Sequence, residues 1–296
     1  MRYTIVIPVK DEEAYVQYVL DSVIHQNILP EMCVVIDDNS TDRTQDIVRA
    51  YAAKFPFIRY YQFPKEGQYE LGGRVVEIFE YGRQIIDHLH LVFDFVVKLD
   101  ADVSFGDDFF DIVGCRVNHD SPGILSGTPY YFLHGRKIID RNPLWHSRGQ
   151  FKIYNVKCLE QTGGIPRSLG WDCADNIKAI EKGWTTIAYP DLFYRIHRRV
   201  GNKYSFNKGR LRHGLGAYYL GYDFTYFILR CIIYLFRRPY ISGSLYMIAG
   251  FVKGSFSDQE RILNSSQIRL LRKLQWGTFF TRMSDRFKQV PEANLS

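Results

Sequence analysis

The sequence predicts an α/β domain with a mostly parallel central sheet flanked by helices, followed by a C-terminal helical region. Within the first 200 of the 296 residues, short apolar runs alternate with segments of helical apolar spacing, the order typical of parallel strands joined by helices. From about residue 201, aromatic and basic segments replace this alternation. We therefore expect two parts, a domain over 1–200 and a helical, aromatic and basic region over 201–296.

The first quarter of the chain supplies three strands and two helices. Continuous apolar runs predict strands over 3–9, 32–37 and 57–63. Helical spacing predicts helices over 11–26 and 42–54, the first with acidic residues in its opening turn and the second after a cluster of capping residues.

The middle of the chain continues the alternation and then loses its periodicity. We expect a helix over 74–90, a strand over 91–99, a helix over 107–117 and a short strand over 123–127. Residues 130–150 are rich in His, Arg, Tyr and Trp without a clear period, which predicts a loop.

The first domain closes with two helices and two strands. Helices are expected over 155–162 and 172–183, and strands over 185–188 and 192–196.

The C-terminal region contains two apolar helical segments, over 224–236 and 240–256, and a further helical pattern over 262–274. Each apolar segment is too short to cross a bilayer. The pair fits either a hairpin lying in a membrane interface, which would be a peripheral contact, or two helices buried against the domain.

Composition limits the classes of partner. The formal charge of +6 favours anionic partners such as phosphates, nucleotides or acidic lipid heads, and no nucleic-acid-binding motif occurs. The five cysteines are scattered without a Cys-x-x-Cys pair, which disfavours a zinc site and is typical of reduced thiols. The chain shows no signal-peptide pattern, so we expect a cytoplasmic protein, peripheral at the membrane at most.

Two carboxylates follow the strand expected over 91–99. Asp100 and Asp102 are two residues apart, so in extended backbone they point the same way. Because like charges repel, such a pair favours a hard divalent cation, Mg²⁺ or Mn²⁺, held together with substrate phosphates. The pair could instead only cap the following turn.

The loop after the first strand excludes several nucleotide-binding folds. Residues 8–13 contain no glycine, so neither a dinucleotide fingerprint nor a P-loop is present, and a sugar-nucleotide pyrophosphorylase is disfavoured. The second strand ends at Asp37 and Asp38, where open α/β sheets bind ligands. Asn39, Ser40 and Thr41 can cap the next helix and leave these carboxylates for a base or a ribose.

Three segments in this order, 5–12, 35–42 and 99–102, resemble a family 2 glycosyltransferase of the GT-A fold over about residues 2–200. The resemblance implies a nucleotide site lined by Pro8, Glu12, Asp37 and Asp38. It also implies that Asp100 faces the ribose or donor sugar and that Asp102 holds the metal that bridges the diphosphate.

An inverting member of this family needs a base for the acceptor hydroxyl. The family usually carries Glu-Asp about eleven residues before a Gly-aromatic pair, and here Trp171-Asp172 precedes Gly183-Trp184. The resemblance therefore implies Asp172 as the base, with Asp175 as the alternative. Both could instead only complement a helix dipole.

Basic and metal-binding candidates come from two further segments. His197, after the last strand, is a candidate for the metal site, and Arg198 and Arg199 for the diphosphate. Gly73 would let the backbone approach the donor, and Arg74 could meet phosphate. An ordinary helix start and a basic surface are the alternatives.

The sequence thus predicts a metal-dependent, inverting glycosyltransferase using Mn²⁺ or Mg²⁺. It would move a sugar from a nucleotide-diphosphate donor to a glycan or a lipid-linked acceptor. The alternative is a catalytically silent partner that binds nucleotide sugars or glycans in a membrane-associated complex.

Overall fold

The computed structural model describes residues 1–64, 72–198, 206–235 and 241–288. The chain forms two compact units, Met1–Asn202 and Lys203–Ser296. All five cysteines carry free thiols.

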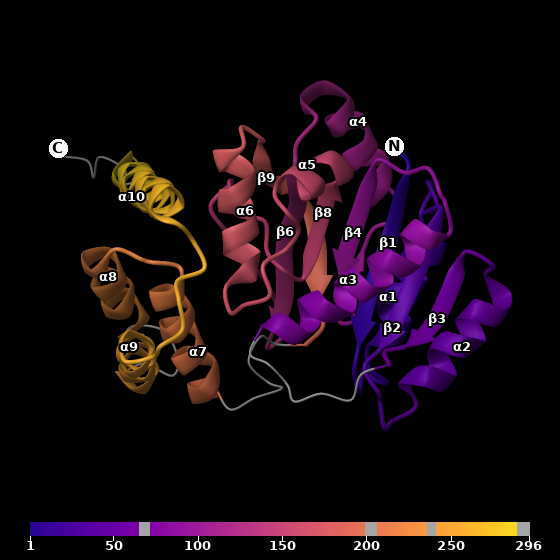
Figure 1. The fold of residues 1–296 in the computed structure, drawn as a ribbon, viewed down its shortest axis with the longest axis horizontal. Coiled ribbons are helices and arrows are strands. Elements are labelled where there is room, and N and C mark those ends of the chain that lie inside the picture. The colour runs from indigo at the N-terminus through magenta and orange to yellow at the C-terminus, as the bar shows by residue number, and fades with distance from the viewer. Residues whose placement is uncertain (65–71, 199–205, 236–240, 289–296) are drawn as a thin grey trace, which may run out of the picture. The chain divides into compact units, whose positions relative to one another are not determined.

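The first unit is built on a nine-stranded sheet with the order β3-β2-β1-β4-β8-β6-β9-β5, with β7 paired to β6 (Figure 1). The strands are β1 (Tyr3–Val9), β2 (Met32–Asp37), β3 (Ile58–Gln62), β4 (Phe95–Leu99), β5 (Val103–Phe105), β6 (Ile124–Leu133), β7 (Arg136–Ile139), β8 (Phe151–Asn155) and β9 (Thr186–Ile196). The strands β1 to β4 pair in parallel, and β5, β7 and β8 pair with their neighbours antiparallel.

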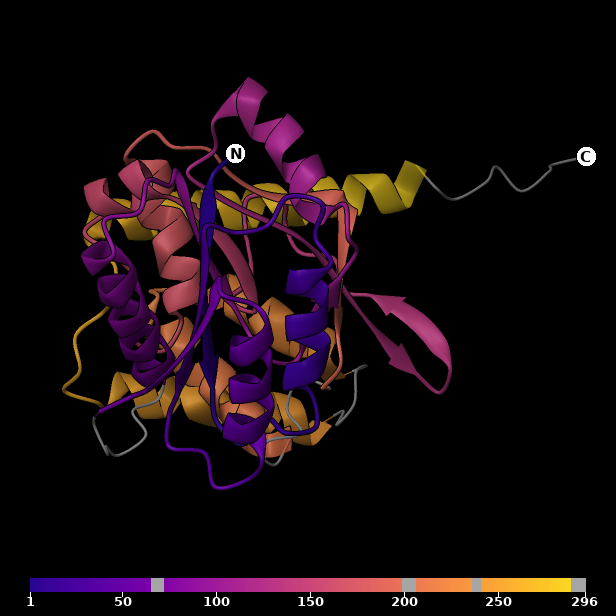
Figure 2. The ribbon, with the colours of Figure 1, turned by 90° about the vertical axis from the view of Figure 1, so that its right-hand side faces the viewer.

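Helices cover both faces of this sheet (Figure 2). They are α1 (Val16–Ile24), α2 (Thr44–Lys54), α3 (Gly73–His88), α4 (Phe109–Asp120), α5 (Val156–Gln161) and α6 (Trp171–Glu181). Alternate residues of β1 enter different cores: Ile5 and Ile7 pack in one cluster with side chains of α1 and α4, and Val6 packs in the other with side chains of α3. Strands buried on both faces explain the continuous apolar runs in the sequence.

The structure corrects the loop expected over 130–150. Strand β6 runs on to Leu133 and forms a hairpin with β7, turning at His134 and Gly135, which both have positive φ. Strand β8 was also not expected, because Lys152 interrupts its apolar pattern although its side chain is buried. The two strands expected over 185–196 are one strand, β9.

The second unit is helical, as expected. Its helices are α7 (Phe206–Tyr219), α8 (Phe224–Leu235), α9 (Ile241–Ser255) and α10 (Ser265–Lys288), of which α7 was not predicted. Among the residues that the structure describes, no helix is long and apolar enough to cross a membrane.

Candidate active site

The sheet topology brings the predicted segments to one edge. Strands β1 and β2 run parallel with Val9 opposite Asp37, and the Asp38 N–H donates to the Val9 carbonyl at 2.8 Å. Strand β4 runs parallel to β1, so Asp100 follows it at the same edge. Strand β9 ends beside the start of β5, where the His197 N–H donates to the Asp102 carbonyl at 2.8 Å.

Asp37 is a buried carboxylate with all its partners inside the protein. Its Oδ1 accepts from the Ser40 N–H at 3.0 Å and from the Ser40 hydroxyl, and its Oδ2 accepts from the Tyr60 hydroxyl at 2.8 Å. Burial, followed by this hydrogen bond, raises the pKa of Tyr60 to about 12. Asp37 therefore orders the turn after β2 and the neighbouring strand β3.

Asp38 forms a buried ion pair with Arg74. The Arg74 Nε lies 3.2 Å from each carboxylate oxygen, its Nη2 also donates to Oδ1, and its Nη1 reaches Glu77 at 3.3 Å. The hydrogen bond with Asp38 raises the pKa of Arg74. Arg74 is therefore placed to fix Asp38 at the edge of the sheet, since its guanidinium is already engaged by carboxylates.

Gly73 is the first residue of α3, but the close backbone contact is made by the residue before it, Gly72, which lies against Ser168. Gly72 has a φ of +84°, and a Cβ there would lie 2.8 Å from the Ser168 carbonyl oxygen. This start positions α3 so that Arg74, in its first turn, reaches Asp38.

Glu12 and Arg198 join the first loop to the end of β9. The Arg198 Nη1 donates to Glu12 Oε1 at 2.9 Å, and Nη2 donates to Oε2. The Glu12 N–H donates to the Thr44 hydroxyl at 2.7 Å. Pro8, one residue before the end of β1, pairs in register with Ile36. Arg199 lies outside the described residues.

Asp102 is the least compensated carboxylate at this edge. Its own burial raises its pKa to about 7, with the charges of Asp100 and Glu12 adding to the effect and those of Arg198 and Lys98 opposing it. Asp100 itself is paired with the buried ammonium group of Lys98. With Asp102 itself, three carboxylates and two cations thus meet at this edge.

His197 is held beside Asp102 as a neutral imidazole. Its Nε2 lies 2.8 Å from the Ser104 hydroxyl, and its ring stacks on Tyr18 with centroids 4.1 Å apart. Burial, with a contribution from Arg195, lowers its pKa to about 4. A neutral imidazole is the form that binds metals, although here the Nε2 already has Ser104 as a partner.

Gly149 brings the predicted base toward the acidic edge. The Lys98 ammonium that pairs with Asp100 also donates to the Gly149 carbonyl at 2.7 Å. A Cβ on Gly149 would lie 2.8 Å from the Trp171 ring and 3.2 Å from the Asp172 Cβ. The absence of a side chain therefore lets the start of α6 lie directly against the segment that binds Lys98.

Asp172 and Asp175 lie one helical turn apart in very different surroundings. The Asp172 side chain is 37% exposed, with its Oδ2 4.0 Å from His146 Nε2. The Asp175 side chain is 4% exposed and accepts from the Lys152 ammonium at 2.7 Å and from the Tyr154 hydroxyl at 2.6 Å. Only Asp172 is therefore open to an acceptor.

Several residues of this site were not singled out from the sequence. Three contacts of the α6 aspartates come from segments without a clear periodicity. His146 lies near Asp172, and Lys152 and Tyr154 donate to Asp175. Lys98 precedes the acidic pair in the sequence, and the structure places its ammonium between Asp100 and Gly149. No local signal in the sequence identifies these partners.

The side chains that the structure describes do not form a complete metal site by themselves. Among the described residues, no three Asp, Glu, His or Cys side chains gather closely enough to hold an ion. The excess of carboxylates around Asp102 nevertheless suits a hard cation, whose remaining ligands would be oxygens of a bound phosphate.

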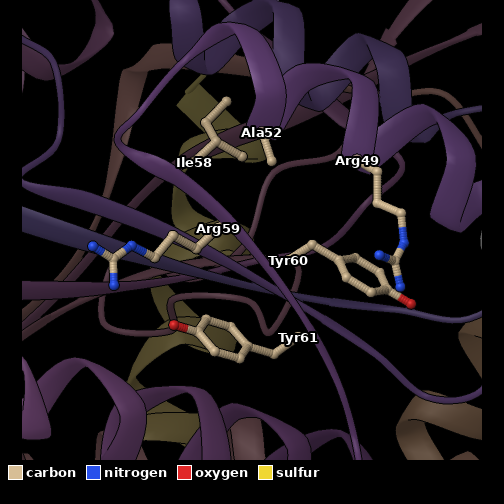
Figure 3. A pocket seen from close by; sticks show the side chains of 6 residues that line it. All are labelled: Arg49, Ala52, Ile58, Arg59, Tyr60 and Tyr61. Atoms are coloured by element: carbon tan, nitrogen blue, oxygen red, sulfur yellow. The ribbon is translucent and has the colours of Figure 1, made fainter.

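A separate hollow of about 450 Å³ lies along the outer strand β3 and helix α2 (Figure 3). In it Arg49 lies over the Tyr60 ring, 4.5 Å from its centroid. None of the predicted site residues line this hollow, so the hollow is separate from the candidate site.

Comparison with known proteins identifies the family of the chain. A family model described as "Glycosyl transferase family 2" matches residues 4–168. A curated relative, the 4,4'-diaponeurosporenoate glycosyltransferase of Staphylococcus haemolyticus, is 24% identical over 169 residues, which are 56% of this chain and 40% of the relative. The chain thus spans about two fifths of that relative's length.

Solved structures share the fold. The mannosyltransferase PcManGT from Pyrobaculum calidifontis, solved with GDP-Man and Mn²⁺, has a TM-score of 0.62 at 16% identity, covering 87% of this chain and 88% of that one. The S. aureus TarS fragment 1–349, solved with UDP-GlcNAc, has a TM-score of 0.54 at 18% identity, covering 87% of this chain and 74% of that one. The predicted GT-A type fold is confirmed.

Proposed function

Because the chain belongs to glycosyl transferase family 2, we propose that it transfers a sugar from a nucleotide-diphosphate donor to a hydroxyl group of a glycan or lipid-linked acceptor, with inversion at the anomeric carbon. The observation that carries this proposal is the meeting of three groups at one sheet edge: the turn at Asp38, the uncompensated carboxylate Asp102, and the open carboxylate Asp172.

The nucleotide side of the site would be the preformed part. Asp37 and Asp38 are held by hydrogen bonds within the protein, and Glu12 is held by Arg198. Fixed polar groups of this kind bind a nucleoside without a cost for ordering them. Arg198 contacts Glu12 and is close enough to Asp102 for their charges to interact. A diphosphate bound beside Asp102 would therefore meet the positive charge of Arg198.

Asp102 would hold a divalent cation, Mn²⁺ or Mg²⁺, and phosphate oxygens of the donor would supply most of its other ligands. Asp100 and His197 lie nearby but are engaged by Lys98 and Ser104. Such a cation, when bound, neutralises the charge that develops on the departing nucleoside diphosphate. The fit rests on the chemistry of the carboxylates around Asp102, and the structures of PcManGT and of GalNAc-T7 that contain Mn²⁺ support it by analogy of fold.

Asp172 would act as the general base. It would take the proton of the acceptor hydroxyl as that oxygen attacks the anomeric carbon in one displacement, a role worth about 10²–10⁴-fold in rate. Lys152 donates to the Asp172 backbone carbonyl at 2.7 Å and so fixes the first turn of α6. Asp175 is not proposed for this role, because Lys152 and Tyr154 already occupy its buried carboxylate.

The test is release of nucleoside diphosphate by the purified full chain with Mn²⁺. UDP-, GDP- and dTDP-sugars are offered in turn, with water or a lipid extract as acceptor. We expect turnover with at least one donor and a loss of about 10²–10⁴-fold in Asp172→Asn.

The matched control is Asp107→Asn, which removes an exposed carboxylate of the same unit and should leave turnover unchanged. A catalytically silent binding partner would give a different result: a nucleotide would raise the melting temperature, no donor would turn over, and Asp172→Asn would change nothing. That result would overturn the proposal.

A further inference from the structure

Helix α9 presents its large apolar side chains outward and its small residues inward. The exposed set, here called the apolar stripe, recurs at helical spacing and consists of Ile241, Leu245, Ile248, Val252 and Phe256, the last just beyond the helix end. The buried residues of the helix are Gly243, Ser244, Met247, Gly250 and Gly254. A helix of a water-soluble domain normally has the opposite arrangement.

The small residues are required by the packing of α9 on α7. A Cβ on Gly250 would lie 2.0 Å from the Leu211 carbonyl oxygen, and one on Gly214 would lie 1.8 Å from the Met247 carbonyl oxygen. The two backbones therefore touch, and large side chains cannot turn inward. Close packing through small residues is the arrangement that helices use where water does not drive apolar side chains inward.

Helix α8 packs against α9 and also exposes apolar side chains. Its Ile232 and Ile233 are exposed, while its Phe227 stacks on Phe251 of α9 with centroids 4.4 Å apart. The Ser244 hydroxyl donates to the Cys231 carbonyl at 2.7 Å. The two helices are thus held together, and their exposed side chains belong to one structural element.

Positive charge is concentrated in the same part of the chain. Residues 203–296 contain 15 Lys and Arg against 5 Asp and Glu, a formal charge of +10, whereas residues 1–202 contain 23 against 27, a charge of −4. Lys253 is exposed between the last two residues of the apolar stripe. An apolar face together with a basic surround is the combination that binds anionic lipid surfaces.

We infer that the apolar stripe, with Ile232 and Ile233, docks the protein on an anionic phospholipid bilayer, with these side chains in the interfacial layer and exposed basic side chains such as Lys253 at the head groups. None of the described helices is both long and apolar enough to span a bilayer, so the contact that we infer is a peripheral one. The inference deepens the proposed function, from which the idea of an acceptor at the membrane comes. Membrane binding is measured without enzymatic turnover, so the inference and the proposed function can each fail independently of the other.

The test is co-sedimentation of the full chain with vesicles of phosphatidylcholine alone or with 30% phosphatidylglycerol (on the order of the anionic fraction that recruits basic surfaces). We expect binding to the anionic vesicles that weakens as salt is raised. The variant Leu245→Gln/Ile248→Gln/Val252→Gln should bind at least about tenfold less, since each side chain loses apolar burial in the interface. The control Leu29→Gln/Val92→Gln changes exposed apolar residues of the first unit and should bind like the unchanged chain.

Three outcomes would overturn the inference. The unchanged chain could fail to sediment with either vesicle, or the stripe variant could bind as well as the control. The stripe could also prove to be a contact between copies, in which case sedimentation equilibrium would show a dimer that the stripe variant loses. Circular dichroism and the melting temperature of both variants verify that the helices are folded.

Discussion

Two acidic segments end the two strands that flank β1, and the protein treats their charges differently. At the end of β2, Asp37 and Asp38 find donors inside the fold, in Tyr60 and Arg74. At the end of β4, Asp102 has other carboxylates close by and a pKa raised by burial to about 7. The same pattern of paired aspartates thus forms a finished structural element in one place and a site short of positive charge in the other.

This difference suggests that Asp37 and Asp38 shape the binding surface, whereas Asp102 takes part in the reaction. Carboxylates that are already paired keep a surface rigid, and their loss should show first in stability. A carboxylate without enough positive charge costs stability but gains strongly from a cation, so its loss should show first in activity. The predictions below test this contrast.

The largest effect is expected for Asp102→Asn. Turnover should fall by about a thousandfold or more, because several kcal/mol of charge stabilisation on the leaving group are lost. Initial rates of nucleoside diphosphate release with Mn²⁺ measure it, with Asp107→Asn as the control. If Asp102→Asn keeps most of its activity, Asp102 does not hold the cation, and the contrast drawn between Asp102 and the paired Asp37 and Asp38 is wrong.

Removing the partner of Asp38 should act on folding. In Arg74→Met the buried Asp38 carboxylate loses its hydrogen-bonded partner and keeps only Lys10, whose ammonium lies 3.9 Å away, which costs up to about 3–5 kcal/mol of the free energy of unfolding. Urea denaturation measures the loss. Arg83→Met is the matched control on the same helix, since its ion pairs are partly exposed and its loss should cost about 1 kcal/mol or less. Equal losses in the two variants would show that Asp38 is not held as described.

The pH dependence of stability should expose Asp102. Its pKa is about 7 in the folded protein against an ordinary value of 3.8, so the folded state binds the additional proton between these values. In the metal-free protein this contribution to stability is full below about pH 4 and is lost as pH rises through 7, on the order of 4 kcal/mol. Asp102→Asn should lack this decline when unfolding is followed in urea with a chelator at pH 5 and pH 8. An identical decline in the variant would assign the effect to another group.

The smallest effect is expected for Tyr60→Phe. Asp37 keeps its bonds from Ser40 and loses one neutral donor, which costs about 1 kcal/mol. Tyr61→Phe, from the neighbouring position of β3 (Figure 3), serves as the control and should cost less. Thermal unfolding of the two variants compares them, and a larger loss in Tyr61→Phe would contradict the role given to Tyr60.

Much of the first unit could be predicted from the sequence because its strands are buried on both faces. Strands β1 and β2 have the predicted bounds, and the three acidic segments mark the edge where they end. Strand β8 could not be predicted, because Lys152 becomes an acceptable core residue only through Asp175, which lies 23 positions away. Helix α7 contains glycines that disfavour a helix, and Gly214 is explained only by its contact with α9.

The same reasoning divides the candidate site. The residue types and their order along the chain indicated which aspartates lie at the edge. Their partners could not be predicted, because the ion pair between Asp38 and Arg74 and the pair between Glu12 and Arg198 join positions 36 and 186 residues apart. Only the fold distinguishes the paired carboxylates from Asp102 and separates the open Asp172 from the buried Asp175.

The most direct test is a crystal of the full chain soaked with Mn²⁺ and the nucleotide sugar that it turns over. We predict an anomalous manganese peak at coordination distance from the Asp102 carboxylate, with the donor's diphosphate beside it and the sugar facing Asp172. A well-ordered donor bound elsewhere, with no manganese at Asp102, would contradict the account.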